Sequence, residues 1–507
     1  MRSSLSTGTS SRAPSWDTAS QSCTVSFTET AITPNDDLLA AARKVRQAMP
    51  CSVQLPAGTG KTHVIAAVGS LAANAGDRTL VLTHTNAGVD ALRRRMTAFG
   101  VTQRHVRVET IASWSHSLVN RYPQLAQFSA PQLPNWSDSL RYYTGAELVV
   151  SSRAIRRVLA ASYDLAVVDE YQDCGADQHA LIRALGEILP VAVFGDPLQS
   201  IFNFGGNVPI TWGTDVAGRW PNTELPARPW RWLGHNEVLG EWLIKVRNDI
   251  ITGAPIVLDE SAPVTWIAAD PANRARACFG HRTAVGSVVA IGDLPHDVAS
   301  QARNLGGLYT VMEEIEGKEM MKFAAFVDKG DPATVASETA KFAKTCAAKL
   351  ADVLDTAVLK KLAAGQSVAH LKRQGAQDAL VRLSVLLDDP SPARVHDALN
   401  ALGSVPTTKI FRHDAWYTIL SALRIATSGT DVAAAVTQLR NRARVTGRRT
   451  TQHVISRPVL IKGLEYDHAI ILDADAHHPT SLYVALTRAR RSLTIISREP
   501  VLRPDAK

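Results

Sequence analysis

The sequence predicts an α/β protein with two parallel-sheet domains, a small insertion and a larger helical insertion. Between residues 34 and 204, short apolar runs alternate with longer stretches of helical periodicity. This alternation is typical of strands and crossover helices in a parallel sheet. A second set of apolar runs begins after Trp220 and resumes at 469–472 and 493–496. The same chain therefore contains two sheet-forming regions.

Four apolar runs are the predicted strands of the first sheet, at 52–55, 79–82, 165–168 and 191–194. The alternation breaks between residues 115 and 145, where Pro123, Pro131 and Pro134 occur, and this break predicts a small insertion. In 341–362, apolar residues at helical spacing predict one core-facing helix with lysines on its solvent face. The predicted units are a disordered Ser- and Thr-rich tail (1–30), a first sheet domain (31–215) with a small insertion at about 115–150, a second sheet domain (216–304 and 450–507) and a helical insertion (305–449).

Composition indicates the kind of partner and compartment. The 507 residues carry a formal net charge of +8, which fits a polyanionic partner, although a slightly basic surface alone would give the same balance. An odd number of cysteines without a C-x-x-C pair argues against a disulfide framework or a zinc cluster. We therefore expect a cytoplasmic protein, and no run is long and apolar enough to predict a membrane span. The cysteines are Cys23, Cys51, Cys174, Cys278 and Cys346.

The strongest single motif is a glycine-rich loop, QLPAGTGKT, at residues 54–62. It follows a short apolar strand and precedes a helical run, which is the context of a phosphate-binding P-loop. Glycines let backbone N–H groups turn toward phosphate oxygens, and the helix N-terminus adds positive potential. We expect Lys61 to reach the β- and γ-phosphates and Thr62 to bind Mg²⁺, whereas Leu55 replaces the first glycine of the general pattern. The predicted nucleotide-binding residues of the loop are Pro56, Ala57, Gly58, Thr59, Gly60, Lys61 and Thr62.

A pair of acids, Asp169 and Glu170, ends the apolar run 165–168. A buried strand that ends in a carboxylate is how a P-loop sheet supplies its second magnesium-binding group. We expect Asp169 to hold Mg²⁺ and Glu170 to activate the attacking water. The alternative is an ordinary strand end with two solvated acids, but the P-loop upstream favours the functional interpretation. ATP and Mg²⁺ are thus the predicted nucleotide and metal.

Further short motifs follow the P-loop in a fixed order, and together they resemble superfamily 1 helicases of the UvrD/Rep type. One short motif is a weak signal, whereas an ordered series that runs from Gln54 to Ala489 is very specific. The motifs are THTNA at 83–87, TIAS at 110–113, DEYQD at 169–173, GDPLQSIF at 195–202, PWR at 229–231, KGLEYD at 462–467 and LYVALTRA at 482–489.

The resemblance implies two RecA-like P-loop domains with ATP in the cleft between them. It implies that Gln199 senses the γ-phosphate and that Arg231 and Arg488 act as arginine fingers, which stabilise charge on the transferring phosphoryl group. Because these arginines belong to the second sheet domain, the resemblance implies a site that is complete only when the cleft closes.

For the base and sugar of ATP, the resemblance implies that Trp230 stacks on adenine and that Glu465 binds the ribose. A core tryptophan is a fair alternative for Trp230, because the neighbouring Trp232 must also be placed.

On the nucleic-acid side, the resemblance implies bases stacked on His84 and Phe204, since single strands are held by aromatic faces and phosphate contacts. A structural histidine is an equally good interpretation of His84. Residues that are predicted to bind the nucleic-acid backbone are Thr83, Asn86 and Thr110.

Three positions depart from the family pattern. Gly205 stands where an arginine usually follows the motif III aromatic, and Val459 stands where motif V usually has a histidine. Gln47 lies closer to the P-loop than the glutamine that reads adenine in the family, so it is left unassigned. The departures at Gly205 and Val459 concern the motifs that couple ATP hydrolysis to movement along the strand. The position of Gln47 concerns the specificity for adenine.

The resemblance implies an ATP-dependent translocase or helicase that moves 3′ to 5′ on single-stranded DNA or a tailed duplex. The alternative is a nucleic-acid-sensing ATPase subunit that regulates or recruits a partner nuclease and unwinds little itself. Compact UvrD-like proteins of this size occur as partners of nucleases in anti-phage systems such as Gabija. A degenerate nucleotide-binding scaffold is a third hypothesis, but Lys61, Asp169, Glu170 and Arg488 argue against it.

Overall fold

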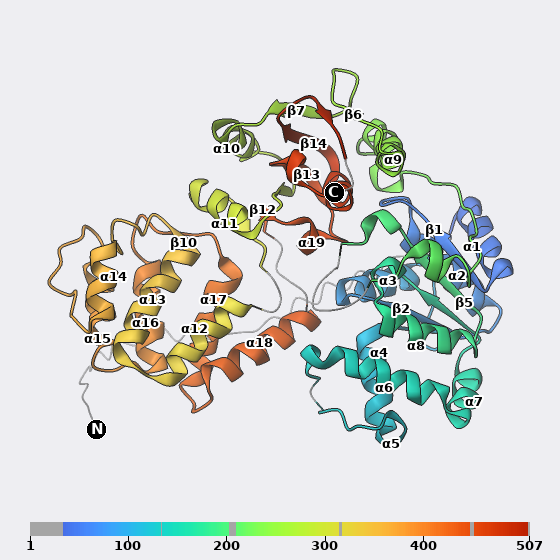
Figure 1. Cartoon of the computed structure of the whole chain (residues 1–507), viewed down its shortest axis with the longest axis horizontal. Helices are drawn as coiled ribbons and strands as arrows, with labels where there is room; N and C mark the ends of the chain where they lie inside the picture. The colour runs from blue at the N-terminus through green and yellow to red at the C-terminus, as the bar shows by residue number, and fades with distance from the viewer. Residues whose placement is uncertain (1–33, 133, 202–208, 314–316, 447–450, 505–507) are drawn as a thin grey trace, which may run out of the picture.

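The computed structural model describes residues 34–132, 134–201, 209–313, 317–446 and 451–504. The predicted tail at 1–30 lies outside these residues, as do Phe204 and Gly205. Figure 1 shows three lobes, two built around a sheet and one built of helices. No helix within the described residues is both long enough and apolar enough to cross a membrane.

The first sheet has five parallel strands in the order β1-β5-β4-β2-β3. Alternate strand residues point to opposite faces, so Val53 and Val167 join one buried cluster, whereas Ala166 and Val168 join the other. Helices cover both faces, which explains why these strands are apolar throughout. The strands are β1 (Cys51–Gln54), β2 (Thr79–Thr83), β3 (Val106–Thr110), β4 (Leu165–Val168) and β5 (Val191–Gly195).

Two groups of helices flank this sheet. The cluster on one face includes residues of α1 (Asp36–Ala48), α2 (Lys61–Asn74) and α3 (Asn86–Ala98). The other face is covered by α4 (Ile111–Arg121), α5 (Pro123–Ala126), α6 (Ser139–Ser151), α7 (Arg153–Ser162) and α8 (Ala176–Gly186). Helix α4 runs past the point at which the sequence predicts the small insertion to begin, and α6 packs on both α4 and α8.

The second sheet has six parallel strands in the order β7-β14-β13-β8-β12-β9. An α/β fold with parallel sheets, predicted from the alternating apolar runs, is therefore confirmed. The strands are β7 (Thr265–Ala268), β8 (Val288–Ile291), β9 (Thr310–Val311), β12 (His453–Ser456), β13 (Tyr466–Ile471) and β14 (Ala489–Ser497). The helices of this lobe are α9 (Glu237–Thr252), α10 (Pro271–Gly280), α11 (Pro295–Asn304), α19 (Pro458–Ile461) and α20 (Pro479–Leu486).

The third lobe is a helical unit with a hydrophobic core of its own. The prediction of one helix over 341–362 is wrong. Helix α13 ends at Cys346, a two-residue strand β10 (Ala347–Ala348) pairs with β11 (Lys409–Ile410), and Lys349 takes a left-handed φ of +62°. The helices are α12 (Lys318–Lys329), α13 (Pro332–Cys346), α14 (Thr356–Ala363), α15 (Gln377–Val385), α16 (Pro392–Gly403), α17 (His413–Ala426) and α18 (Val432–Thr446).

Candidate nucleotide site between the two sheets

The glycine-rich loop connects β1 to α2 at the carboxyl edge of the first sheet. Gly60 is the N-cap of α2 with a φ of +92°, and Gly58 has a φ of +73°, so both positions are left-handed and favour glycine. The backbone N–H groups of the first turn of α2, where Thr62 lies, are therefore oriented as in an anion site. The Nζ atom of buried Lys61 donates to the carbonyl of Leu55 at 3.0 Å. The hydroxyl of Thr59 donates to the carbonyl of Pro56 at 2.8 Å.

Two tryptophans from the short helix η5 (Trp230–Trp232) pack directly on this loop. A Cβ atom added at Gly58 would lie 2.6 Å from the ring of Trp232, and one added at Gly60 would lie 2.8 Å from that of Trp230. Trp232 is buried, and its Nε1 donates to the carbonyl of Ala489 at 2.7 Å. Of the two neighbours, Trp232 is thus the core tryptophan, and Trp230 lies half-buried beside the loop.

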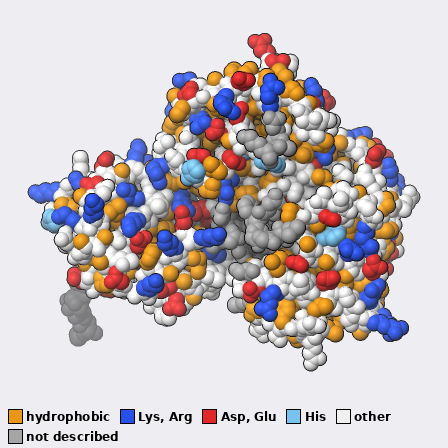
Figure 2. Space-filling view, in the orientation of Figure 1, with side chains coloured by type: hydrophobic (Ala, Val, Ile, Leu, Met, Phe, Trp, Pro, Cys, Tyr) orange, Lys and Arg blue, Asp and Glu red, His pale blue; other side chains and the backbone are white. Residues whose placement is uncertain are grey.

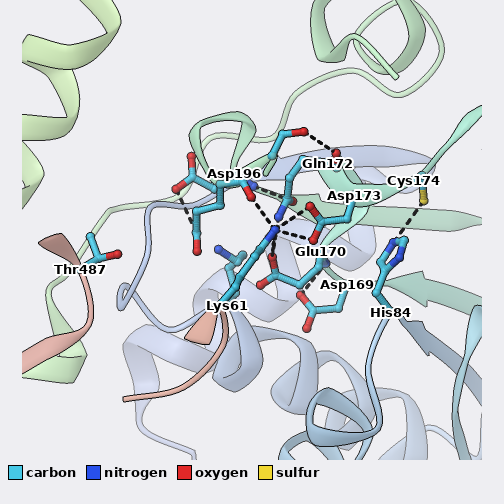
Figure 3. A network of polar contacts seen from close by, with 12 residues as sticks. Lys61, His84, Asp169, Glu170, Gln172, Asp173, Cys174, Asp196 and Thr487 are labelled. Atoms are coloured by element: carbon cyan, nitrogen blue, oxygen red, sulfur yellow. Dashed lines mark hydrogen bonds and ion pairs between the residues drawn. The ribbon is translucent and has the colours of Figure 1, made fainter. Parts of the chain in front are cut away.

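Two acids at the end of β4 face the lysine of the loop (Figure 3). Burial and the neighbouring Glu170 raise the pKa of Asp169 to about 7. Burial also opposes the charge of Glu170, but Lys61 and Lys462 outweigh it and lower the pKa of Glu170 below its usual value. Glu170 has a φ of +55°, a strained conformation that is often found at functional sites. This arrangement keeps the side chain of Glu170 ionised and fixed in orientation beside the P-loop.

Lys462 is a member of this cluster that the sequence analysis did not select. Its ammonium group contacts the carboxylate of Asp173 and the carbonyl of Gln199, and it lies 3.8 Å from Glu170. Burial raises the pKa of Asp173 to about 7, although Lys462 acts against this rise. Lys462 follows helix α19 of the second sheet lobe, whereas Asp173, Gln199 and Glu170 belong to the first sheet lobe. The KGLEYD motif contained the lysine, but only the tertiary contact identifies its partners.

Gln199 lies in the short helix η3 (Pro197–Gln199), directly after β5. Its Nε2 donates to Asp196 at 3.1 Å. The side chain of Gln172 connects this segment to the acids, because its Oε1 accepts from the backbone N–H of Asp196 at 3.0 Å and its Nε2 donates to Glu170. The predicted sensor and the predicted base are therefore linked through Gln172.

The two predicted arginine fingers lie in the second sheet lobe, and in this structure their guanidinium groups bond to atoms of that lobe. Arg231 donates through Nε to Glu465 at 2.9 Å and through Nη1 to the carbonyl of Thr487 at 2.6 Å, and its backbone N–H donates to the carbonyl of Gly58 at 3.0 Å. Glu465, the predicted ribose ligand, is thus held by Arg231.

Arg488 is fully buried and bonds to atoms of its own lobe. It donates to the carbonyls of Val484 at 2.7 Å and Leu464 at 3.0 Å. Burial and the nearby positive charge of Arg231 lower the pKa of Arg488 to about 9. In this conformation its guanidinium is bound by backbone carbonyls, so a role as a finger requires the side chain to reorient.

The predicted nucleic-acid residues within the described part of the chain lie at or just after the carboxyl ends of β2 and β3. Thr83 is buried, Asn86 begins α3, and the hydroxyl of Thr110 accepts the N-cap hydrogen bond from Ser113 at 3.0 Å. His84 points toward Cys174, with 3.5 Å between Nε2 and Sγ (Figure 3). Burial, and then the charge of Lys462, lower the pKa of His84 to about 4.

The residues at the loop fit a magnesium ion that is shared with phosphate oxygens. No group of three or more His, Cys, Asp or Glu side chains in the described part of the chain could hold a metal without other ligands. Asp169 is a buried acid beside the P-loop, and a cation there would offset the burial that raises its pKa. Thr62 and Asp169 would hold the ion, which neutralises charge on the β- and γ-phosphates when bound.

Comparison with known proteins identifies the class of the first sheet. Residues 39–205 match the family model described as an AAA domain. This match spans β1 to β5, the glycine-rich loop and the acidic strand end, so the chain contains a P-loop nucleotide-binding domain of the AAA type. No curated protein matches the chain.

Proposed function

We propose that this protein is an ATP-dependent translocase or helicase of superfamily 1 that acts on single-stranded DNA. In this proposal the two sheet lobes are RecA-like domains, over 31–215 and over 216–304 with 450–507, and residues 305–449 are a reduced helical insertion. One observation carries the proposal: groups from the second sheet lobe contact the P-loop and the acids of the first. Relative movement of the lobes would therefore change the geometry around the nucleotide.

The residues around the loop have separable tasks in this mechanism. Lys61 binds phosphate oxygens, and Glu170, kept ionised by Lys61 and Lys462, orients and deprotonates the attacking water. Gln199 reports the state of the γ-phosphate to the contacts between the lobes. Arg231, whose backbone N–H already contacts the loop at Gly58, turns its guanidinium from Glu465 to the nucleotide and supplies positive charge to the transferring group. Closure of the lobes brings these groups together, and opening separates them.

The charge of the protein supports a nucleic-acid partner. The formal net charge is +8, and Lys and Arg side chains are distributed over all three lobes on the face shown in Figure 2. The four cysteines in the described part of the chain are free thiols, which fits the reducing cytoplasm that we propose as the compartment.

The experiment that tests the proposal measures phosphate release with and without single-stranded DNA. We expect hydrolysis that DNA stimulates, and we expect Lys61→Ala to abolish it. Lys322→Ala, which changes an exposed lysine of α12, is the matched control and should retain full activity. A wild-type protein that hydrolyses ATP without any response to nucleic acid would contradict the translocase.

A second candidate function is a nucleic-acid-sensing ATPase subunit that regulates a partner nuclease and unwinds little. The conformation of His84 favours it, because a ring directed at Cys174 is not presented to a base. A tailed duplex with a 3′ single strand distinguishes the two candidates. Strand displacement supports the motor, whereas DNA-stimulated hydrolysis without displacement supports the sensor.

A further inference from the structure

A buried carboxylate, Asp196, lies at the contact between the two sheet lobes. Its side chain is 0% exposed and follows the last residue of β5. The guanidinium of Arg247, on α9 of the second lobe, donates to Oδ1 of Asp196 through Nη2 at 2.9 Å and through Nε at 3.3 Å. An ionised acid with no access to water is costly unless a cation and hydrogen bonds compensate it. Arg247 is that cation, and it comes from the other lobe.

The second oxygen of the same carboxylate holds Gln199. The Nε2 group of Gln199 donates to Oδ2 of Asp196 at 3.1 Å, so one carboxylate receives Arg247 on one oxygen and Gln199 on the other. A carboxylate that is fixed at one oxygen by two donors has little freedom to rotate. The orientation of the Gln199 amide therefore depends on Arg247 through Asp196.

Tyr483 extends this connection to the P-loop. Its hydroxyl accepts from the backbone N–H of Ala57 at 3.0 Å, and the same hydroxyl interacts with Asp196 and Arg247. Tyr483 lies on α20 and is buried at the contact of this helix with η3. The loop, the Gln199 segment and two elements of the second lobe thus meet at one buried point.

We propose that Arg247 is a positioning residue that orients Gln199 through Asp196 only while the two lobes are in contact. This inference rests on the proposed ATPase function and adds a device to it: separation of the lobes removes Arg247 from Asp196 and releases the Gln199 amide. In the open form hydrolysis is then suppressed through Gln199, in addition to the effect of withdrawing Lys462 from Glu170.

The test is a double-mutant cycle that combines Arg247→Ala with Gln199→Ala, read as steady-state hydrolysis with saturating single-stranded DNA. We expect Arg247→Ala to lower kcat by about 10- to 100-fold with less than about a 3-fold change in KM, a fall within the range that positioned groups supply. In the Gln199→Ala background the same substitution should lower kcat by less than about 2-fold, because residues that act as one unit are not additive. Arg247→Lys, which keeps the charge but not the two-donor geometry, should restore part of the activity.

A matched control is Arg274→Ala, which removes an ion pair of the same length, 2.9 Å, between Arg274 and Asp473 inside the second sheet lobe. It should leave kcat unchanged in both backgrounds. Tyr483→Phe, which keeps the ring and removes only the hydroxyl, provides a conservative second test if Arg247→Ala does not fold, and it should also be non-additive with Gln199→Ala.

The outcomes separate this inference from the proposed function. If the wild-type protein hydrolyses no ATP, or if Lys61→Ala remains active, the proposed function fails. If the wild-type protein is active and Arg247→Ala is normal, or if the effects of Arg247→Ala and Gln199→Ala on kcat simply multiply, the positioning role is wrong and Arg247 only holds the lobes together.

Discussion

At the scale of single residues, the two acids that end β4 differ in charge because their surroundings differ. Burial and repulsion from Glu170 raise the pKa of Asp169, whereas the positive charges of Lys61 and Lys462 lower the pKa of Glu170. A general base has to be ionised and within reach of a water molecule. Glu170 meets the first condition in this structure.

The first prediction concerns Glu170→Gln. The amide retains the size and polarity of the side chain but accepts no proton, so we expect kcat for ATP hydrolysis to fall by about 10²- to 10⁴-fold. The affinity for a fluorescent ATP analogue should change by less than about 3-fold. Glu187→Gln, at a largely exposed glutamate, is the control. Unchanged turnover in Glu170→Gln would exclude Glu170 as the base.

The second prediction concerns pH and His84. The pKa of His84 is about 4 in the folded protein and 6.5 in the unfolded chain, so between these values only the unfolded chain binds the proton. The free energy of unfolding should therefore be fully retained above pH 6.5 and fall by up to about 3 kcal/mol as the pH drops to 4.

Urea titrations of the wild-type protein and His84→Gln across this pH range check the second prediction. The variant should show a smaller fall in the free energy of unfolding between pH 6.5 and pH 4. His296→Gln, in which the replaced side chain is 77% exposed, should follow the wild type. Parallel curves for wild type and His84→Gln would contradict the burial of a neutral imidazole.

At the scale of elements, the glycine-rich loop is constrained by its own backbone and by the neighbouring lobe. Gly58 and Gly60 have left-handed φ angles, as a phosphate-binding loop requires. Both also lack room for a Cβ atom, because Trp230 and Trp232 of η5 lie against them. The P-loop motif predicts the first constraint, whereas the second comes from a helix about 170 residues later in the chain.

The third prediction separates these two constraints by comparing Gly58→Ala with Gly76→Ala. Both glycines have similar left-handed φ angles, +73° and +85°, but nothing lies within 4 Å of a Cβ atom at Gly76. Gly76→Ala should lower the free energy of unfolding by about 1–2 kcal/mol, the cost of the backbone conformation alone. Gly58→Ala should cost about 1–3 kcal/mol more, because its Cβ atom overlaps Trp232.

Thermal unfolding of the two variants, with and without an ATP analogue, measures this difference. Gly58→Ala should also lose most of the stabilisation that the nucleotide confers, whereas Gly76→Ala should keep it. Equal destabilisation in the two variants would show that Trp232 does not constrain the loop in solution.

At the scale of the whole molecule, the lobes are joined by buried polar contacts as well as by apolar packing. Lys462 of the second lobe binds Asp173 of the first, and Arg247 binds Asp196. Breaking one partner of a buried ion pair costs about 3–5 kcal/mol, more than most surface contacts. Removal of one partner while the lobes stay together would therefore leave an uncompensated buried charge at their contact.

The fourth prediction concerns Lys462→Met. The substitution leaves Asp173 and Glu170 close together without their shared cation, so the lobes should separate more often. We expect the radius of gyration from small-angle X-ray scattering to rise and DNA-stimulated hydrolysis to fall by at least about 10-fold. Lys245→Met, at an exposed lysine of α9, should change neither quantity. A compact and active Lys462→Met variant would refute a closing role for this lysine.

The predictable part of this protein is local. Apolar runs at 165–168 and 191–194 coincide with strands β4 and β5 because strands that are buried on both faces must be apolar along their whole length. The prediction of one helix over 341–362 is wrong because buried residues on two helices separated by a turn can also recur at helical spacing. Phe342 and Val358 are both buried as expected, but they lie on helices α13 and α14, which β10 and Lys349 separate.

The site was predictable where one short segment supplies the chemistry. The P-loop, Asp169 and Glu170 each follow a strand directly, and the AAA-domain match at 39–205 covers all of them. Lys462 and Tyr483 lie within the motifs KGLEYD and LYVALTRA, and Arg247 lies in a run of ordinary helical pattern, but for all three only the tertiary contacts identify the partners.

The sequence by itself thus determined the alternation of strands and helices, the phosphate-binding loop and the acids beside it, because backbone conformation and strand burial depend on neighbouring residues. Only the tertiary structure decided that Lys462 meets Asp173, that Arg247 meets Asp196 and that the tryptophans of η5 cover the loop. Those contacts join residues that are far apart in the chain. Their energies depend on burial, and these side chains become buried only when the lobes pack together.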